Sequence, residues 1–270
     1  MTEIESHEPI IRVENLTMAY GDFVVQKDLT FSINRGDIFV VMGGSGCGKS
    51  TLLRHLIGLQ PPAAGKVYYG NDSLWDAEPR ARQAILRQVG VLYQSGALFT
   101  SMTLAENIAL PLGEYTDLNA KRIRAVACLK LALVGLAGYE DFFPSQISGG
   151  MMKRAGLARA MALDPKILFF DEPSAGLDPI SSKRLDDLIR QLRDDLGATI
   201  VMVTHELPSI FAIASNSIYL DNVKRTITAE GDPRDMVRES KEPVVRDFLT
   251  REGTFGEAAT HPAASHRVSQ

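Results

Sequence analysis

A glycine-rich stretch, placed between an apolar run and a helical pattern, constrains this chain more than any other feature. The apolar run covers residues 38–42, and apolar residues at helical spacing return over 52–57. A strand, a glycine-rich turn and a helix start in this order match the nucleotide-binding P-loop pattern G-x-x-x-x-G-K-[ST]. The residues predicted to bind the nucleotide here are Gly43, Gly44, Ser45, Gly46, Cys47, Gly48, Lys49, Ser50 and Thr51.

The chemistry of these residues suggests what each can do. Glycines allow backbone angles that a Cβ would block, so successive N–H groups can face one anion. The helix that follows adds the positive end of its dipole. Lys49 is expected to reach the β- and γ-phosphates, and the Ser50 hydroxyl to bind Mg²⁺. The alternative is a glycine-rich turn that binds nothing.

Length and charge narrow the class of protein. The 270 residues are enough for one large domain or two small ones. The net charge of −4 argues against nucleic acid as the main partner. No apolar stretch reaches the ~18 residues of a membrane span, and the first residues lack the pattern of a signal peptide. With Cys47 and Cys128 as its two cysteines, the chain has no disulfide framework, and a cytoplasmic protein is expected.

Charged and polar residues follow two buried-type strands in the second half of the chain. Asp171 and Glu172 come directly after the apolar run 167–170, and His205 follows the run 198–204. The carboxyl ends of parallel strands meet at the ligand-binding edge of an open α/β sheet. Asp171 could hold Mg²⁺ through water, and Glu172 could orient or deprotonate an attacking water. Plain strand-end carboxylates and a structural histidine are the alternatives.

Between these regions the pattern becomes helical. A short helix over 103–110 is expected to stop at Pro111, and a longer helix is expected over 119–136. A further helix begins after Ser148, which as a plain N-cap needs no other role. Lys153 and Arg154 follow in its early turns, where cations oppose the helix dipole. An anion bound at this helix start would explain them.

From about residue 10 to 230 the chain resembles the ATP-binding cassette (ABC) family. The resemblance implies an α/β P-loop NTPase of RecA-like fold, with an antiparallel β subdomain and an inserted helical subdomain at about 95–160. The domain boundaries that follow are 8–230 for the ATPase domain and 231–252 for a C-terminal helical extension. The composition of 253–270 predicts a disordered tail.

The resemblance also implies a specific role for individual residues of this sequence. Glu172 and His205 become the catalytic pair, and Ser50, Gln94 and Asp171 the Mg²⁺ site. Ser148, Gly149 and Gly150 form the signature that binds ATP held by a second copy of the chain, and Asp178 belongs to the D-loop. ATP would thus join two chains head to tail. Met151 departs from the glutamine common in this signature. Tyr20 either stacks on adenine or packs a β-turn.

Within this family, residues 94–103, 106–112 and 148–151 are most similar to the ATPase subunits of Mla-type transporters. That similarity implies phospholipid transport between inner and outer membranes. The implied partners are an integral membrane permease, an MCE-domain protein and a small STAS-type accessory protein, with the chain peripheral on the cytoplasmic face of the inner membrane. Another ABC importer or exporter, for a sterol, another lipid or a small solute, is the alternative.

Further expectations concern surfaces and one thiol. The permease is expected in a cleft beside Gln94, walled by Leu98, Phe99, Met102 and Leu104, although these residues could equally form helical-subdomain core. Cys47 is expected to be reactive, because P-loop amides and Lys49 favour its thiolate. A helix over 232–251, with Val244, Val245, Phe248 and Leu249 on an apolar face, is expected to dock on the chain or its dimer partner.

Soluble ABC ATPases that act on DNA or ribosomes are a rival class. They usually carry two cassettes or a long coiled-coil insertion, and neither pattern occurs in this sequence. P-loop kinases and GTPases are a second rival class, but they lack the signature around Ser148. A GTPase would also need an Asn-Lys-x-Asp motif, which this sequence does not contain.

Overall fold

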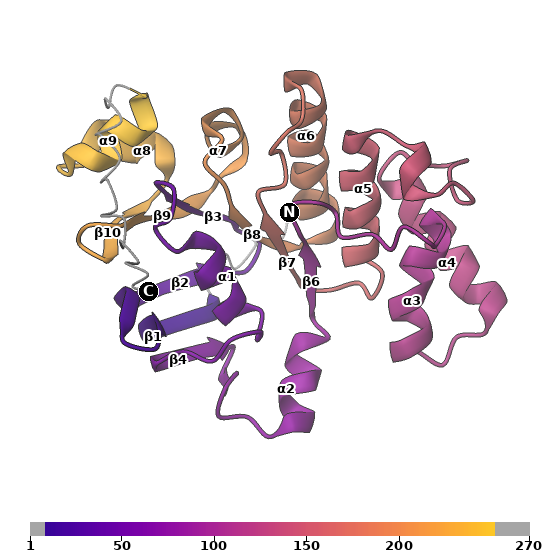
Figure 1. The fold of residues 1–270 in the computed structure, drawn as a ribbon, viewed down its shortest axis with the longest axis horizontal. Helices are drawn as coiled ribbons and strands as arrows, with labels where there is room; N and C mark the ends of the chain where they lie inside the picture. The colour runs from indigo at the N-terminus through magenta and orange to yellow at the C-terminus, as the bar shows by residue number, and fades with distance from the viewer. Residues whose placement is uncertain (1–8, 252–270) are drawn as a thin grey trace, which may run out of the picture.

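The computed structural model describes residues 9–251, which are built around a six-stranded sheet (Figure 1). Its strands are β3 (Ile38–Gly43), β6 (Val89–Leu92), β7 (Ile167–Asp171), β8 (Thr199–Val203), β9 (Asn216–Asp221) and β10 (Thr226–Gly231). Their order is β10-β9-β3-β8-β7-β6, and all neighbours are parallel except β10 with β9. The expected α/β class is confirmed, and the carboxyl ends of β3, β7 and β8 share one edge.

A smaller antiparallel sheet lies against one face of this central sheet (Figure 1). It consists of β1 (Pro9–Tyr20), β2 (Phe23–Asn34), β4 (Ala64–Tyr69) and β5 (Asp72–Ser73), in the order β2-β1-β4-β5. Helix α1 (Lys49–Leu56) buries Leu52 and Leu56 in the same cluster as Ile11 and Val13 of β1. The P-loop helix is therefore packed against the small sheet as well as the large one.

Alternating side chains of the central strands fill two separate cores. On β3, Ile38, Val40 and Met42 enter one cluster, whereas Phe39 and Val41 enter the other. Because successive side chains of a strand point to opposite faces, a strand buried on both sides reads as a continuous apolar run. This explains why the run before the P-loop has no polar position.

Helices cover the sheet face opposite to the small sheet. They are α3 (Leu104–Tyr115), α4 (Ala120–Leu133), α5 (Gly149–Ala160), α6 (Pro179–Leu196) and α7 (Leu207–Ile213), with the 3-10 turn η1 (Pro144–Gln146) before α5. Helix α2 (Pro79–Leu86) lies on the other side, where Ile85 packs in the cluster of the small sheet. Helices α3, α4 and α5 pack together beyond the β6 edge (Figure 1). No helix of residues 9–251 has both the length and the apolar character required to cross a bilayer.

One helix boundary differs from expectation. Helix α3 does not stop at Pro111 but continues through it to Tyr115. A proline removes one backbone hydrogen bond from a helix interior, and packing can outweigh that loss. Ile108 and Leu112, on either side of Pro111, are both buried in the core, so tertiary contacts hold the helix on both sides.

The C-terminal segment forms two short helices instead of the single one expected, α8 (Pro233–Glu239) and α9 (Pro243–Thr250). The break occurs because residues before a proline favour extended backbone, as Glu242 does before Pro243. Val245 and Leu249 are buried in the main core, and Phe248 meets Tyr219 edge-on at 5.3 Å between ring centres. Docking on its own chain is confirmed. The tail expected over 253–270 lies outside the described residues.

Candidate active site

The P-loop wraps around the amino end of helix α1. Gly43 (φ 146°) and Gly48 (φ 100°) have backbone conformations that suit glycine, and a Cβ on Gly43 would lie 2.5 Å from Leu220 O. Gly44 has open space at that position, so sterics do not require glycine there. The Lys49 ammonium donates to Gly43 O and Gly44 O, each at 2.9 Å. The lysine therefore curls over the concave side of its own loop.

Ser50 and Asp171 come together although they are far apart in sequence. The Ser50 hydroxyl donates to Asp171 Oδ1 at 3.2 Å. Burial raises the pKa of Asp171, while the hydrogen bond from Ser50 lowers it. A hydroxyl and a carboxylate next to a phosphate-binding loop are oxygen ligands that suit Mg²⁺, which binds through one or two carboxylates plus substrate phosphates and water. The residues present therefore fit a magnesium nucleotide.

Glu172 and His205 form the second pair at this edge. His205 Nδ1 lies 2.8 Å from Glu172 Oε1, and the His205 side chain is 57% exposed. The other carboxylate oxygen, Glu172 Oε2, is buried and has no hydrogen-bond partner in the described part of the chain. An unpaired buried carboxylate oxygen is costly unless something uses it. The sequence prediction that His205 faces the same crevice as Glu172 is confirmed.

Gln94 lies at the same edge of the sheet. Strand β6 pairs with β7 so that Leu92 is opposite Phe170, and Gln94 follows two residues beyond. Asp171 is close enough to Tyr93 that both burial and the carboxylate raise the pKa of the tyrosine. Gln94 is exposed and directly follows Tyr93, and its expected role as a ligand stays a prediction.

The signature residues lie in a separate place. Ser148 Oγ accepts from Met151 N at 3.3 Å and caps α5, and Asp178 caps α6 by accepting from the N–H groups of Ile180 and Ser181. Gly149 is exposed and Gly150 partly so, at the start of α5. Within residues 9–251, no hydrogen bond or ion pair joins Ser148 or Asp178 to the P-loop. The structure brings together one half of the expected site, not both.

Lys153 and Arg154 have partners within the chain, so neither of them requires an anion at the start of α5, and the anion expected there stays a prediction. Lys153 is buried and donates to Glu172 O at 3.2 Å. Arg154 Nη1 donates to Val134 O at 2.9 Å, at the end of α4. Arg154 still lines a small pocket together with Ser148 and Gly150, whereas Lys153 is directed to the end of β7.

The environment of Cys47 differs from the one that the sequence predicted. Its side chain is buried, and burial raises the pKa of the thiol despite the positive charge of Lys49. Desolvation disfavours the thiolate more than the nearby ammonium favours it. The expected reactive thiol is therefore wrong, because the loop turns Cys47 inward, where its Sγ would be 2.6 Å from a Cβ on Gly43.

Tyr20 was expected either to stack on adenine or to pack a β-turn. Its ring is 47% exposed at the end of β1, beside the first turns of α1. A side-chain hydrogen bond to Thr51 is the main cause that lowers the pKa of Tyr20, followed by Arg54. An exposed aromatic next to the P-loop helix is available for stacking on a base, and this role stays a prediction.

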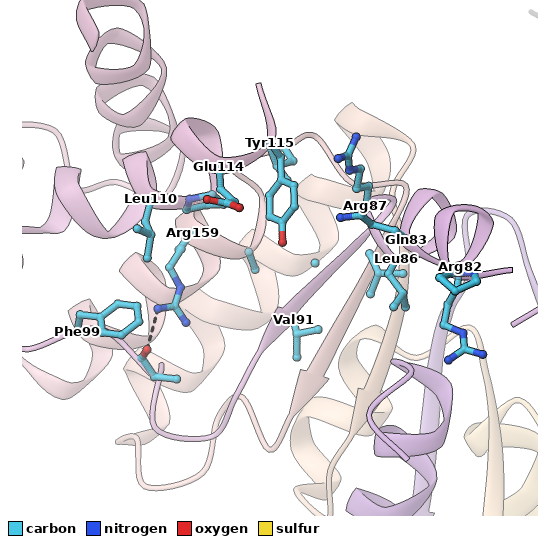
Figure 2. A pocket seen from close by; sticks show the side chains of 17 residues that line it. Arg82, Gln83, Leu86, Arg87, Val91, Phe99, Leu110, Glu114, Tyr115 and Arg159 are labelled. Carbon is cyan, nitrogen blue, oxygen red and sulfur yellow. Dashed lines mark hydrogen bonds between the residues drawn. The ribbon is translucent and has the colours of Figure 1, made fainter. Parts of the chain in front are cut away.

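A groove of about 920 Å³ runs along the free edge of β6 (Figure 2). Phe99, Leu110 and Arg159 lie on one side and Leu86 on the other, with Val91 between them (Figure 2). Its full lining is Pro79, Arg82, Gln83, Leu86, Arg87, Val89, Gly90, Val91, Ala97, Phe99, Leu110, Pro111, Glu114, Tyr115, Arg159, Ala160 and Leu163.

The expected walls of this cleft are only partly right. Phe99 lines it and is 50% exposed, but Leu104 is fully buried in the main core. Leu98 and Met102 are partly buried and do not line the groove. Strand β6 and helix α2 supply the opposite wall, because β6 is the edge strand of the sheet and leaves that flank open.

The sequence did not predict two side chains whose hydrogen bonds fix the P-loop and the loop beside the groove. Gln26 of β2 is fully buried, and its amide donates to Cys47 O at 2.7 Å and to Asp221 O at 2.9 Å, which fixes the P-loop against β9. Arg159 donates to Ala97 O at 2.7 Å and holds the loop that carries Phe99 (Figure 2). A polar residue among the apolar positions of β2 was the one available signal for Gln26.

Comparison with known proteins agrees with this geometry. The family model described as ABC transporter matches residues 26–175. The chain is 42% identical over 239 residues to the probable ribonucleotide transport ATP-binding protein mkl of Mycobacterium tuberculosis, and covers 66% of that protein and 88% of itself. It is 35% identical over 260 residues to the intermembrane phospholipid transport system ATP-binding protein MlaF of Haemophilus influenzae, covering 97% of that protein and 96% of itself.

A solved structure with the same fold contains a bound nucleotide. The dimeric ATP-binding cassette MJ0796, in a post-hydrolysis state bound to ADP and phosphate, superimposes with a TM-score of 0.74 at 29% identity. The match covers 82% of this chain and 98% of that one.

Proposed function

Because this chain belongs to the ABC transporter family, we propose that it is the ATP-hydrolysing subunit of a transporter that moves phospholipid between two membranes. One observation carries the catalytic part of this proposal. The Ser50–Asp171 and Glu172–His205 pairs meet beside Lys49 at one edge of the sheet, although the chain separates them widely. Such a convergence supports phosphoryl transfer to water.

Each residue of the cluster has a chemical task in this proposal. Lys49 leaves its loop carbonyls and binds the β- and γ-phosphates as a cation. Mg²⁺, held by Ser50 and Asp171 with Gln94 nearby, would neutralise charge on the phosphates. Glu172 orients the attacking water and accepts its proton, and the unpaired Oε2 is an acceptor available for this. His205 holds the other oxygen, which fixes the direction of the carboxylate.

A second copy of the chain completes the site. Ser148, Gly149 and Gly150 are exposed or partly exposed, and they start a helix whose amino end favours an anion. They are not joined to their own P-loop, which supports a role toward ATP held by a facing chain. ATP would then join two chains head to tail, and a cassette of the same fold is dimeric when bound to ADP and phosphate.

The groove along β6 is the surface proposed for the integral membrane permease. It is open, has apolar residues on both walls and is lined by β6, the strand that leads to Gln94. A short amphipathic helix fits such a groove through spaced apolar anchors. The Asn107 side chain accepts from the backbone N–H of Phe99 and donates to its C=O, which fixes the backbone that carries the exposed ring.

A pair of matched substitutions tests this surface. Phe99→Asp should abolish co-purification with the permease while ATP binding by the isolated chain is unchanged. Leu129→Asp places the same charge on an equally exposed apolar residue of α4, 57% exposed and outside the groove, and should leave the complex intact. Loss of the complex in both variants, or in neither, would reject the groove as the docking surface.

The phospholipid cargo is supported by the MlaF relative, whose length the chain matches almost fully. The proposal includes an MCE-domain protein and a small STAS-type protein as further partners, and a position on the cytoplasmic face of the inner membrane. The test is ATP-dependent transfer of labelled phospholipid between vesicles by the reconstituted complex. The mycobacterial relative is named for ribonucleotide transport. Transport of a ribonucleotide without lipid transfer would overturn the cargo and leave the ATPase.

A further inference from the structure

Lys153 is a buried lysine that contacts the backbone of the proposed catalytic residue. It is 7% exposed, and its ammonium donates to Glu172 O at 3.2 Å. Burial lowers the pKa of Lys153, while the carboxylates of Glu172 and Asp171 oppose that shift. A buried ammonium is tolerated only with hydrogen-bond partners and nearby negative charge. Lys153 is therefore tied to the end of β7.

Glu172 needs such support because its backbone is strained. Its φ of 48° lies in the left-handed region, which a residue with a Cβ seldom adopts. Its N–H donates to Val203 O at 2.8 Å, its C=O accepts from Lys153, and its carboxylate meets His205. These contacts reach Glu172 from β8, from α5 and from the segment after β8. Removing one of them should let the backbone relax and turn the carboxylate.

The contact from α5 differs from the others because of where this helix begins. Ser148 caps α5, and Lys153 follows five residues later, which is about 7.5 Å along the helix axis. A helix is stiff over this distance. A Cβ on Gly156 of the same helix would lie 2.9 Å from Gly96 O, so the helix also packs closely on the loop after Gln94. A shift at Ser148 therefore reaches Lys153.

The geometry points to Lys153 as a positioning residue that makes the orientation of Glu172 depend on the ATP bound to Ser148 of the same chain. This inference rests on the proposed function, in which that ATP is held by the P-loop of the facing chain. Each chain then uses one end of α5 to sense the opposite nucleotide and Lys153 to hold its own Glu172. One helix links the two sites of the dimer.

The first test separates positioning from binding. Lys153→Met should lower kcat for ATP hydrolysis about 10- to 100-fold, the size expected for a lost charged hydrogen bond. KM for ATP and nucleotide affinity should stay within about 2-fold. Lys153→Arg should restore part of kcat because it keeps a cationic donor. Lys130→Met is the matched control. It also removes a buried ammonium from the helical region, one paired with Asp164, and should leave kcat within about 2-fold.

The second test measures the link between sites. In mixed dimers, one chain carries Lys49→Ala and cannot fill its P-loop, so α5 of the other chain has no nucleotide to sense. When the hydrolysing chain has Lys153, the hydrolysis rate of the intact site should therefore fall to well below half of the rate per site in the unaltered dimer. When that chain carries Lys153→Met, the empty site should cause little further loss.

Two results would overturn the role of Lys153. One is that the empty site lowers the hydrolysis rate of the intact site by the same factor in chains with Lys153 and in chains with Lys153→Met. The other is a Lys153→Met effect carried by KM or ATP affinity instead of kcat. If Lys153→Met does not fold, Lys153→Gln is used instead, because its side chain is one bond shorter and uncharged and so also removes the charged hydrogen bond to Glu172 O. The proposed function fails separately, if the unaltered chain does not hydrolyse ATP or if Glu172→Gln hydrolyses it at a normal rate.

Discussion

Asp186 gives a prediction whose size follows from the structure. This residue of α6 is 6% exposed, and its Oδ2 accepts from the Ser209 hydroxyl of α7 at 2.9 Å. Burial raises the pKa of Asp186 from 3.8 to about 6, and the hydrogen bond from Ser209 only partly opposes this. The folded state therefore binds the proton more tightly than the unfolded chain does.

The sign of the pH effect follows because the pKa of Asp186 is higher in the folded state than in the unfolded chain. The stability contributed by protonated Asp186 is fully present below about pH 4 and is lost as pH rises through about 6. At 1.36 kcal/mol per pKa unit, the total loss is at most about 3 kcal/mol above pH 7. Asparagine has the same shape and no titration, so Asp186→Asn should stabilise the protein by about 1–3 kcal/mol at neutral pH.

Urea unfolding of both proteins at several pH values provides the assay. The difference in unfolding free energy between Asp186→Asn and the unaltered chain should grow by about 1.4 kcal/mol from pH 5 to pH 8. Ser209→Ala should make the stability of the aspartate-containing chain fall further over the same interval, because the hydrogen bond that lowers the pKa is lost. A difference that stays flat with pH, or a destabilised Asp186→Asn, would refute the reasoning.

Packing and the corrected thiol give further predictions. Leu249→Ala should cost about 2–4 kcal/mol of unfolding free energy because Leu249 is buried, whereas Val244→Ala, 37% exposed on the same helix, should cost below about 0.5 kcal/mol. Gly90→Ala should destabilise by about 1–3 kcal/mol, because its Cβ would lie 2.2 Å from a carbonyl oxygen of α5. Gly113→Ala, with open space in α3, should stabilise by up to about 1 kcal/mol, and a reversed order in urea unfolding would contradict this packing. Maleimide should label Cys47 slowly with or without Mg-ATP and rapidly in the denatured chain; rapid labelling of the folded chain would contradict its burial.

The parts of the site that sequence could predict depend on short-range rules. The P-loop is a local pattern, so Lys49 and Ser50 were placed correctly at the start of α1. Parallel strands end at one edge, so Asp171 and His205 could be expected near each other without knowing the strand order. These rules hold because each concerns a few neighbouring residues or a general property of sheets.

What sequence could not predict concerns side chains whose direction depends on distant segments. The partner of Lys153 is the carbonyl of Glu172, which comes from the end of another element and not from the start of α5. Cys47 looked activated by its neighbours along the chain, but its burial depends on β9 and β2. Leu104 looked like a cleft wall, but α3 turns it into the core. Local charge and periodicity contain no information about these contacts.

The most direct test of the central claim is the mass of Glu172→Gln in solution, measured by light scattering with and without Mg-ATP. The substitution keeps the shape of the side chain, removes its ability to accept a proton, and should slow hydrolysis by about 10²- to 10⁴-fold. ATP should then remain bound between the P-loop of one chain and Ser148 of the other. The predicted result is one chain without nucleotide and twice that mass with Mg-ATP. A mass that does not change with Mg-ATP, together with near-normal hydrolysis, would contradict a shared site in which Glu172 activates the water.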